Sequence, residues 1–280
     1  MNKLEITTRI GCKCNCYFCP QDKITKSFAS SNRPGKNHKQ IMSLDDFKFM
    51  IDKVPSEVTI EFAGMAEPWL NKDCTKMLLY ANYKGHPIGV YTTAVNMTKD
   101  DIDNIKIVPF TTFRLHVPDN SNFMKIDPDN KYIETIEYLL NSNINNINIM
   151  SMNKVHKKLE HIVGKYYRDV MTDRAGNLSV ASSIPVQSSQ FKTGPLTCAW
   201  TDTFKNNVLL PDGTVLLCCM CYSMEHILGN LMDQSYESLF TGFEHQNIIR
   251  ALSNKSNYYI LCRSCSASIP KADTGDNYEL

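Results

Sequence analysis

Four cysteines occupy eight positions near the start of the chain, in the stretch GCKCNCYFCP at residues 11–20. Cys12, Cys16 and Cys19 have the spacing C-x3-C-x2-C, and Cys14 is additional. Thiolates are soft ligands that suit zinc or iron–sulfur clusters. A structural zinc site is closed by four ligands, whereas three cysteines around a four-iron cluster leave one iron without a protein ligand. The spacing therefore favours an open iron–sulfur cluster, and a zinc site closed by Cys14 is the alternative.

A second group of cysteines lies in the last third of the chain: Cys198, Cys218, Cys219, Cys221, Cys262 and Cys265. The segment VLLPDGTVLLCC at 208–219 predicts a β-hairpin that turns at Asp212-Gly213, because glycine takes a positive φ without strain. Side chains alternate along a strand, so Cys218 and Cys219 should point to opposite faces and not bind one cluster together. The group predicts a second metal centre, with a zinc ribbon as the alternative.

The composition limits the kind of protein and the partners that it has. The 280 residues include 30 basic and 29 acidic side chains, and the net charge of +1 gives no electrostatic argument for a nucleic-acid or membrane partner. No apolar run approaches the roughly 18–20 residues that span a bilayer, and the opening MNKLEITTRI lacks the apolar core of a secretory signal. We therefore expect a cytoplasmic protein, in which 11 cysteines serve metal binding or catalysis rather than disulfides.

Strand-like and helix-like segments alternate through the first two thirds of the chain. The expected strands are 4–10, 57–64, 87–94, 111–117, 144–152 and 177–183. The expected helices are 43–54, 74–85, 98–105, 131–142 and 157–170. Ser43 can cap the first of these, with Asp46 three residues on, and Pro55 ends it. This alternation predicts a parallel sheet with helices outside, either open or closed as a barrel. In such sheets the chemistry lies at the C-terminal ends of the strands, and the first cysteine group directly follows the first strand.

The alternation stops near residue 184, where the polar, Pro- and Gly-containing stretch IPVQSSQFKTGPLT begins. Such a stretch predicts a linker between two folding units. We therefore expect an α/β domain over residues 1–184 and a small, cysteine-rich domain with the hairpin over residues 185–280.

The C-x3-C-x2-C stretch after the first strand resembles the radical S-adenosylmethionine (radical SAM) superfamily. The resemblance implies a partial (β/α)6 barrel with a [4Fe-4S] cluster held by Cys12, Cys16 and Cys19. It further implies that the amine and carboxylate of SAM chelate the open iron. The residue before the third cysteine is Phe18, and the family pattern implies that this ring packs on the adenine of SAM.

Two further segments are similar to SAM-binding segments of this family. In FAGMAEP at 62–68, a Gly-Gly-Glu-type stretch that binds the SAM amino group corresponds to Gly64, Met65, Ala66 and Glu67. Alanine at position 66 departs from the pattern, in which glycine is common.

In YTTA at 91–94, the family resemblance implies SAM-proximal positions for Thr92 and Thr93. Arg114 and His116 end the fourth expected strand, and Ser151 ends the fifth; all three could face SAM or the substrate. Cys74, on an expected helix, should be a buried small apolar residue.

The distal cysteines resemble the SPASM/twitch extension of radical SAM enzymes. Cys198-x14-Gly213-x4-Cys218 and the distant C-x2-C carry this likeness, so that the resemblance covers nearly the whole chain. It implies one auxiliary [4Fe-4S] cluster held by Cys198, Cys218, Cys262 and Cys265. We prefer Cys218 on spacing, although Cys219 and Cys221 stay open as its replacement. Candidate hydrogen-atom donors are Cys14, Cys219 and Cys221.

The family resemblance also implies the chemistry. SAM would be cleaved reductively to a 5′-deoxyadenosyl radical that abstracts hydrogen from a substrate C–H, with a reductant such as flavodoxin or ferredoxin as partner. We expect a two-electron oxidation of a small molecule such as a sugar or cyclitol, with the auxiliary cluster as electron acceptor. The sugar-alcohol dehydrogenases of aminoglycoside biosynthesis are family examples. The alternatives are crosslinking or epimerisation of a ribosomally made peptide and, in another class, a non-catalytic iron–sulfur or zinc protein.

Overall fold

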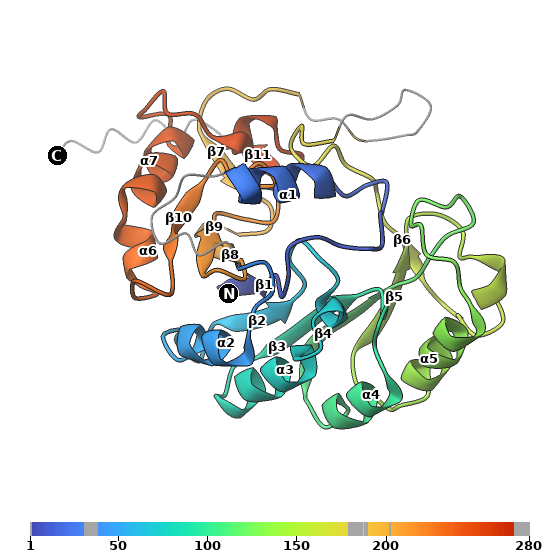
Figure 1. Ribbon diagram of the computed structural model, residues 1–280. Coiled ribbons are helices and arrows are strands. Elements are labelled where there is room, and N and C mark those ends of the chain that lie inside the picture. Colours follow the sequence, from blue (N-terminus) through green and yellow to red (C-terminus); the bar gives the residue numbers. More distant parts are fainter. Residues whose placement is uncertain (1, 31–38, 179–186, 188–189, 202, 272–280) are drawn as a thin grey trace.

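The computed structural model describes residues 2–30, 39–178, 187, 190–201 and 203–271. A curved nine-stranded sheet forms the centre of the molecule, in the order β10-β9-β8-β1-β2-β3-β4-β5-β6 (Figure 1). The strands from β8 through β1 to β6 are parallel to one another, whereas β9 pairs antiparallel with both β8 and β10. A second, two-stranded sheet pairs β11 with β7. The predicted α/β partial-barrel class with a small C-terminal extension is confirmed.

The strands of the first part are short and follow the predicted order. They are β1 (Lys3–Ile6), β2 (Thr59–Phe62), β3 (Ile88–Thr92), β4 (Phe110–His116), β5 (Ile147–Ser151) and β6 (Tyr167–Arg168). On β1, Leu4 and Ile6 are fully buried in the outer core, while Lys3 and Glu5 point to the other face. This period of two gives the sheet an apolar convex face, which the helices cover, and a concave face with polar residues.

The helices of the first part are α1 (Gln21–Ser30), α2 (Leu44–Ile51), α3 (Cys74–Tyr83), α4 (Lys99–Ile105) and α5 (Asn130–Leu140). The Ser43 side chain caps α2 by accepting a hydrogen bond from the Asp46 backbone, as the sequence predicts, and Thr98 and Asp101 form a capping box at α4. Figure 1 shows α2 to α5 side by side along the convex face. Helix α1, which we did not predict, follows the cysteine loop directly.

The helix predicted over 157–170 is wrong. The chain forms only a short 3-10 helix, η2 (Lys157–Leu159), and then the edge strand β6, which pairs with Met150 and Ser151 of β5. Gly164 interrupts the helical pattern, and the aromatic pair that follows it suits a strand better than a helix. The strand predicted over 177–183 and the domain boundary near 184 lie almost wholly outside the described residues, so both stay predictions.

The C-terminal part contributes short elements to both sheets. Its elements are β7 (Leu196–Cys198), β8 (Asn206–Leu209), β9 (Thr214–Leu216), β10 (Ile227–Asn230), α6 (Ser238–Thr241), α7 (Phe243–Leu252), η3 (Leu261–Ser264) and β11 (Ser268–Pro270). A second 3-10 helix of the first part, η1 (Pro68–Leu70), follows β2. Within the described residues, no helix combines the length and the apolar character needed to cross a membrane.

The predicted hairpin is confirmed, and its position is the main surprise of the fold. Strands β8 and β9 turn at Gly213, whose φ is +87°, and an added Cβ would lie 2.4 Å from the Asn230 side-chain oxygen. Strand β8 pairs in parallel with β1, from Lys3 opposite Asn206 onward. The hairpin therefore extends the barrel sheet itself, and brings the second cysteine group against the first strand.

Candidate active site

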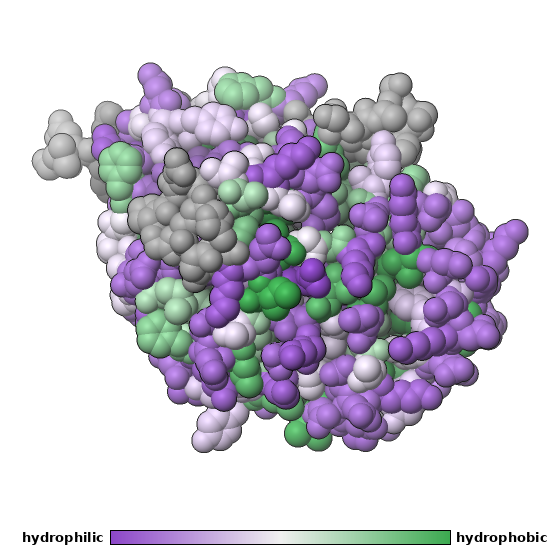
Figure 2. All heavy atoms as spheres, viewed as in Figure 1, coloured by the Kyte–Doolittle hydropathy of each residue, from purple (hydrophilic) through white to green (hydrophobic). Residues whose placement is uncertain are grey.

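One cavity of about 630 Å³ on the concave side of the sheet joins the two cysteine groups. Nine of the eleven cysteines line it: Cys12, Cys14, Cys16, Cys19, Cys198, Cys218, Cys219, Cys262 and Cys265. Cys74 and Cys221 do not, and both are fully buried in the core. On the face seen in Figure 2, apolar side chains gather in a depression near the centre, surrounded by hydrophilic ones. The two ends of the sequence thus contribute thiols to one site.

The first cysteine group lies on the loop between β1 and α1. Backbone hydrogen bonds tie this loop to the segment after β4, from Tyr17 N to Phe123 O (2.7 Å) and from Lys125 N to Cys14 O (3.2 Å). The Gln21 side chain donates both to the Cys19 sulfur (3.2 Å) and to Met65 O (2.5 Å). The loop is therefore held from both sides, which fixes the directions of its thiols toward the cavity.

Cys12 and Cys14 are in contact. A hydrogen bond from the Cys14 thiol, and a weaker one from the Glu67 backbone N–H, lower the pKa of Cys12 to about 6 despite burial. A lowered pKa favours the thiolate, which is the form that binds metal. Cys14 also lies 3.7 Å from the Thr93 hydroxyl. The surplus cysteine is therefore placed between a proposed ligand and the end of β3.

Glu67 is the most densely hydrogen-bonded carboxylate of the cavity. It accepts hydrogen bonds from the Thr92 hydroxyl (2.6 Å), the Thr93 backbone (2.6 Å) and the Thr93 hydroxyl (2.7 Å), and a longer one from the Trp69 backbone (3.3 Å). Burial raises the pKa of Glu67 to about 7, and these hydrogen bonds oppose the rise. The two threonines thus orient Glu67 as well as lining the cavity.

The segment before Glu67 packs tightly on β1. Gly64 has a φ of +65°, and an added Cβ would lie 2.2 Å from the Thr7 hydroxyl, so only glycine fits here. The Met65 backbone N–H donates to that hydroxyl at 3.0 Å. Gly64, Met65 and Ala66 all line the cavity, and the close packing aims their backbone at it.

Phe18 and Ser151 have different positions relative to the cavity. The Phe18 ring lines it and stacks on His116, with ring centroids 5.2 Å apart and an interplanar angle of 21°. Burial, and more weakly the Arg174 guanidinium, lowers the pKa of His116 to about 3, so this imidazole is neutral near pH 7. Ser151 is fully buried behind the lining, and its hydroxyl has no hydrogen-bond partner among the described residues.

The second cysteine group comes from three segments. Antiparallel pairing of β7 with β11 sets Cys198 opposite Ser268, whose hydroxyl donates to Cys262 O (2.5 Å) and Cys265 O (2.8 Å). Burial raises the pKa of Cys265 to about 11, and the nearby Cys218 and Cys198 add to the rise. Cys218, Cys198 and the C-x2-C pair therefore lie close to one another.

Cys219 points away from that group. Its thiol donates a hydrogen bond to Glu5, and the Arg174 guanidinium lies nearby. Alternation along the chain after β9 thus separates Cys218 from Cys219, while Cys221 contacts Cys218 from within the core.

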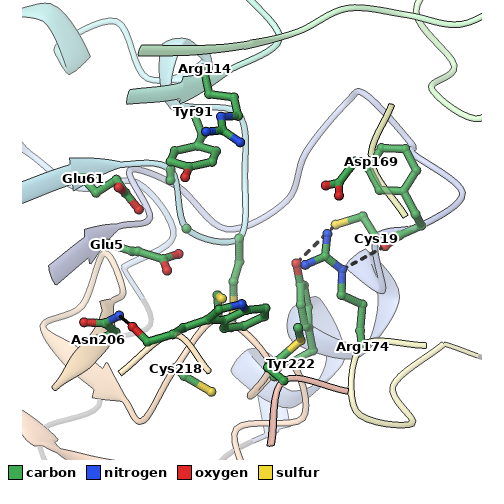
Figure 3. A pocket seen from close by; sticks show the side chains of 18 of the residues that line it. Glu5, Cys19, Glu61, Tyr91, Arg114, Asp169, Arg174, Asn206, Cys218 and Tyr222 are labelled. Atoms are coloured by element: carbon green, nitrogen blue, oxygen red, sulfur yellow. Dashed lines mark hydrogen bonds between the residues drawn. The ribbon is translucent and has the colours of Figure 1, made fainter. Parts of the chain in front are cut away.

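Charged residues on the concave face are the part of the site that the sequence analysis missed. Glu5, Glu61 and Arg174 line the cavity together with Arg114, which we had singled out (Figure 3). Arg174 Nε donates to Phe18 O at 3.4 Å, next to Cys19. Glu5, Glu61 and Arg114 alternate with buried apolar residues in KLEI, TIEF and FTTFRLH. This alternation in the sequence could have predicted that these charged side chains face the inside of the barrel.

The donor chemistry of both groups fits iron–sulfur clusters. Among the described residues, no three His, Cys, Asp or Glu side chains converge on a position for a single metal ion. The thiols instead stand around the cavity as free cysteines, and thiolates are the usual ligands of four-iron clusters.

Family models match both parts of the chain. The model described as the Radical SAM superfamily matches residues 6–163, and the SPASM model, an iron–sulfur cluster-binding domain, matches residues 198–266. A curated relative, the probable dual-specificity RNA methyltransferase RlmN of Shouchella clausii (strain KSM-K16), is 29% identical over 151 residues. The match covers 48% of this chain and 41% of the relative, so it spans less than half the length of that protein.

Several solved structures share the fold. BtrN in complex with AdoMet and 2-DOIA has a TM-score of 0.60 and 15% identity, covering 91% of this chain and 88% of that one. Native anSMEcpe with bound AdoMet and Cp18Cys peptide has a TM-score of 0.55 and 16% identity, covering 94% and 86%. Streptococcus suis SuiB bound to the precursor peptide SuiA has a TM-score of 0.61 and 11% identity, covering 95% and 69%. At these identities the likeness is one of fold.

Proposed function

Because the chain belongs to the radical SAM superfamily, we propose that it oxidises a small polar molecule by two electrons, using its SPASM-type cluster as the electron acceptor. It is an enzyme whose cofactors are SAM, a SAM-binding [4Fe-4S] cluster and an auxiliary iron–sulfur cluster. The observation that carries the proposal is the single cavity joining both cysteine groups, since a substrate there would touch both reaction partners.

We assign the ligands from their places around the cavity. Cys12, Cys16 and Cys19 hold the SAM-binding cluster, which supplies the electron that cleaves SAM to a 5′-deoxyadenosyl radical. Their common loop at the end of β1 supports this assignment. Cys198, Cys218, Cys262 and Cys265 hold the auxiliary cluster, and their mutual proximity supports that set.

The chain's own residues bind and orient SAM. Glu67 attracts its amino group, because a buried carboxylate fixed in place by Thr92 and Thr93 favours a nearby ammonium. Phe18, stacked on the neutral His116, offers an apolar face to the adenine. A flavodoxin or ferredoxin is the proposed reductant.

A small substrate suits the space better than a peptide. SAM and two clusters must share the cavity of about 630 Å³, so little volume remains between them. The peptide complexes of anSMEcpe and SuiB make peptide modification the competing outcome. Inward-facing charges deep in the barrel favour the small molecule, because only a compact polar ligand reaches them.

Anaerobic reconstitution with iron and sulfide tests the proposal. The wild-type protein should hold about eight irons per chain, as two four-iron clusters, and release 5′-deoxyadenosine from SAM. The triple variant Cys12→Ala/Cys16→Ala/Cys19→Ala should retain about four irons and lose cleavage. The pair Cys262→Ala/Cys265→Ala should keep uncoupled cleavage but lose turnover. Tightly bound zinc without SAM cleavage would overturn the assignment.

A further inference from the structure

Two carboxylates stand side by side deep in the cavity. Glu5 of β1 and Glu61 of β2 are direct partners in the parallel register, so their side chains leave the sheet on the same face. Glu61 forms an ion pair with Lys3 at 3.1 Å. Gly89 of β3 makes room for it, since an added Cβ would lie 3.0 Å from the Glu61 carboxylate. Within the described chain no ion pair reaches Glu5, so one negative charge is left without a direct counter-charge.

A guanidinium lines another wall of the same cavity. Arg114 of β4 lies between two tyrosine rings, with its Cζ 5.3 Å from the centroid of Tyr91 and 4.9 Å from that of Tyr167. It donates a hydrogen bond to the Tyr167 hydroxyl, and its Nε is buried without a hydrogen-bond partner among the described residues. No carboxylate of the described residues forms an ion pair with it. The two aromatic rings therefore position the Arg114 guanidinium at the cavity wall.

Figure 3 shows Arg114 and Tyr91 together on one wall of the cavity, with Glu61 and Glu5 beside them. Burying charges that lack partners is costly unless a ligand supplies the opposite charges. Burial and the neighbouring Glu61 raise the pKa of Glu5 to about 7, while the hydrogen bond from Cys219 and the cations Lys3 and Arg174 oppose the rise. A ligand with an ammonium at Glu5 and an anionic group at Arg114 would satisfy both sites at once.

We propose that this part of the cavity is the substrate site and that it selects a zwitterionic small molecule. Its amino group binds Glu5 beside Glu61, and its carboxylate or other anionic group binds Arg114. The inference rests on the proposed function, whose substrate class it names. The amino group would lie next to Cys219, whose thiol donates a hydrogen bond to Glu5.

Three matched probes test this on the reconstituted protein with SAM: 5-aminopentanoate, pentylamine and pentanoate. Calorimetry should show that 5-aminopentanoate binds at least about tenfold more tightly than either single-charge probe, the effect of one charge-assisted hydrogen bond. Glu5→Gln should remove that advantage and leave the affinity for pentanoate unchanged. Arg114→Gln should weaken the binding of 5-aminopentanoate and pentanoate and leave the affinity for pentylamine unchanged. Glu160→Gln and Arg250→Gln, both exposed and outside the cavity, are the controls.

Equal binding of all three probes, no binding of any, or unchanged selectivity in the two variants would overturn the inference. Glu5→Asp, which keeps the charge but shortens its reach, replaces Glu5→Gln if that protein does not fold. Iron content and uncoupled 5′-deoxyadenosine release, measured on the same samples, report separately on the proposed function. A sample with both clusters and active cleavage but no charge selectivity therefore refutes only the substrate class.

Discussion

Replacing Glu67 by glutamine should separate SAM binding from protein stability. The Glu67 carboxylate accepts hydrogen bonds on both oxygens, from Thr92 and Trp69 on one and from Thr93 on the other. The Thr92 hydroxyl already accepts from the Ala94 backbone, which commits it to donating to Glu67. In glutamine one oxygen becomes an NH₂ group, so whichever way the amide turns, a donor meets the Trp69 or the Thr93 backbone N–H.

Two opposing terms set the effect on stability. Losing one or two hydrogen bonds to a charged acceptor costs about 1.5–3 kcal/mol each. Against this, the pKa of Glu67 near 7 means that burying its charge already costs about 3 kcal/mol at neutral pH, and the amide removes this cost. The terms nearly cancel, and we expect the free energy of unfolding to change by no more than about 2 kcal/mol. The free energy of SAM binding has no such compensation, because the SAM ammonium loses a charged partner. The loss is worth about 1.5–3 kcal/mol, so the Kd for SAM should rise roughly 10–150-fold.

Calorimetric SAM titration and chemical denaturation of the reconstituted protein measure the two effects. Glu134→Gln, an exposed carboxylate on α5 outside the cavity, is the control. SAM affinity within about threefold of wild type would refute the role given to Glu67, since one lost charged contact exceeds that. A loss of stability above about 5 kcal/mol would instead refute the cancellation.

Three further variants test other parts of the site. Arg174→Gln removes the cation beside Cys19 and Cys219 and should lower the reduction potential of the SAM-binding cluster by on the order of 100 mV. This shift corresponds to about 3 kcal/mol for two charges ~6 Å apart at an effective dielectric near 20. A redox titration followed by EPR measures the potential, and an unchanged value would contradict this prediction. Because the pKa of Glu5 is raised to about 7 in the folded protein, the stability associated with its protonated form is lost as the pH rises through 7. Glu5→Gln should therefore gain about 3 kcal/mol at pH 8 but less than about 1 kcal/mol at pH 5, and denaturation showing the same gain at both would refute this. Cys14→Ala should keep both clusters and SAM cleavage, and loss of cleavage would contradict the ligand assignment.

Local sequence patterns predicted most of the barrel and the placement of several site residues. Capping at Ser43 and the Asp212-Gly213 turn depend on neighbours in the chain, and both were predicted correctly. The helix over 157–170 was wrong, because pairing of β6 with β5 outweighs a weak helical pattern. Glu5 and Glu61 went unnoticed, since an isolated charge on a strand gains meaning only when the register sets two of them side by side.

The sequence by itself determined the family and its chemistry, because the spacing of cysteines on one loop is a local property that can be read directly from the order of residues. It also determined that a second thiol group exists near the other end. Only the tertiary structure decided that β8 pairs with β1, which joins both groups to one cavity. It alone placed Arg174 near both Cys19 and Cys219. Contacts between segments some 200 residues apart depend on strand register and packing, which no local pattern encodes.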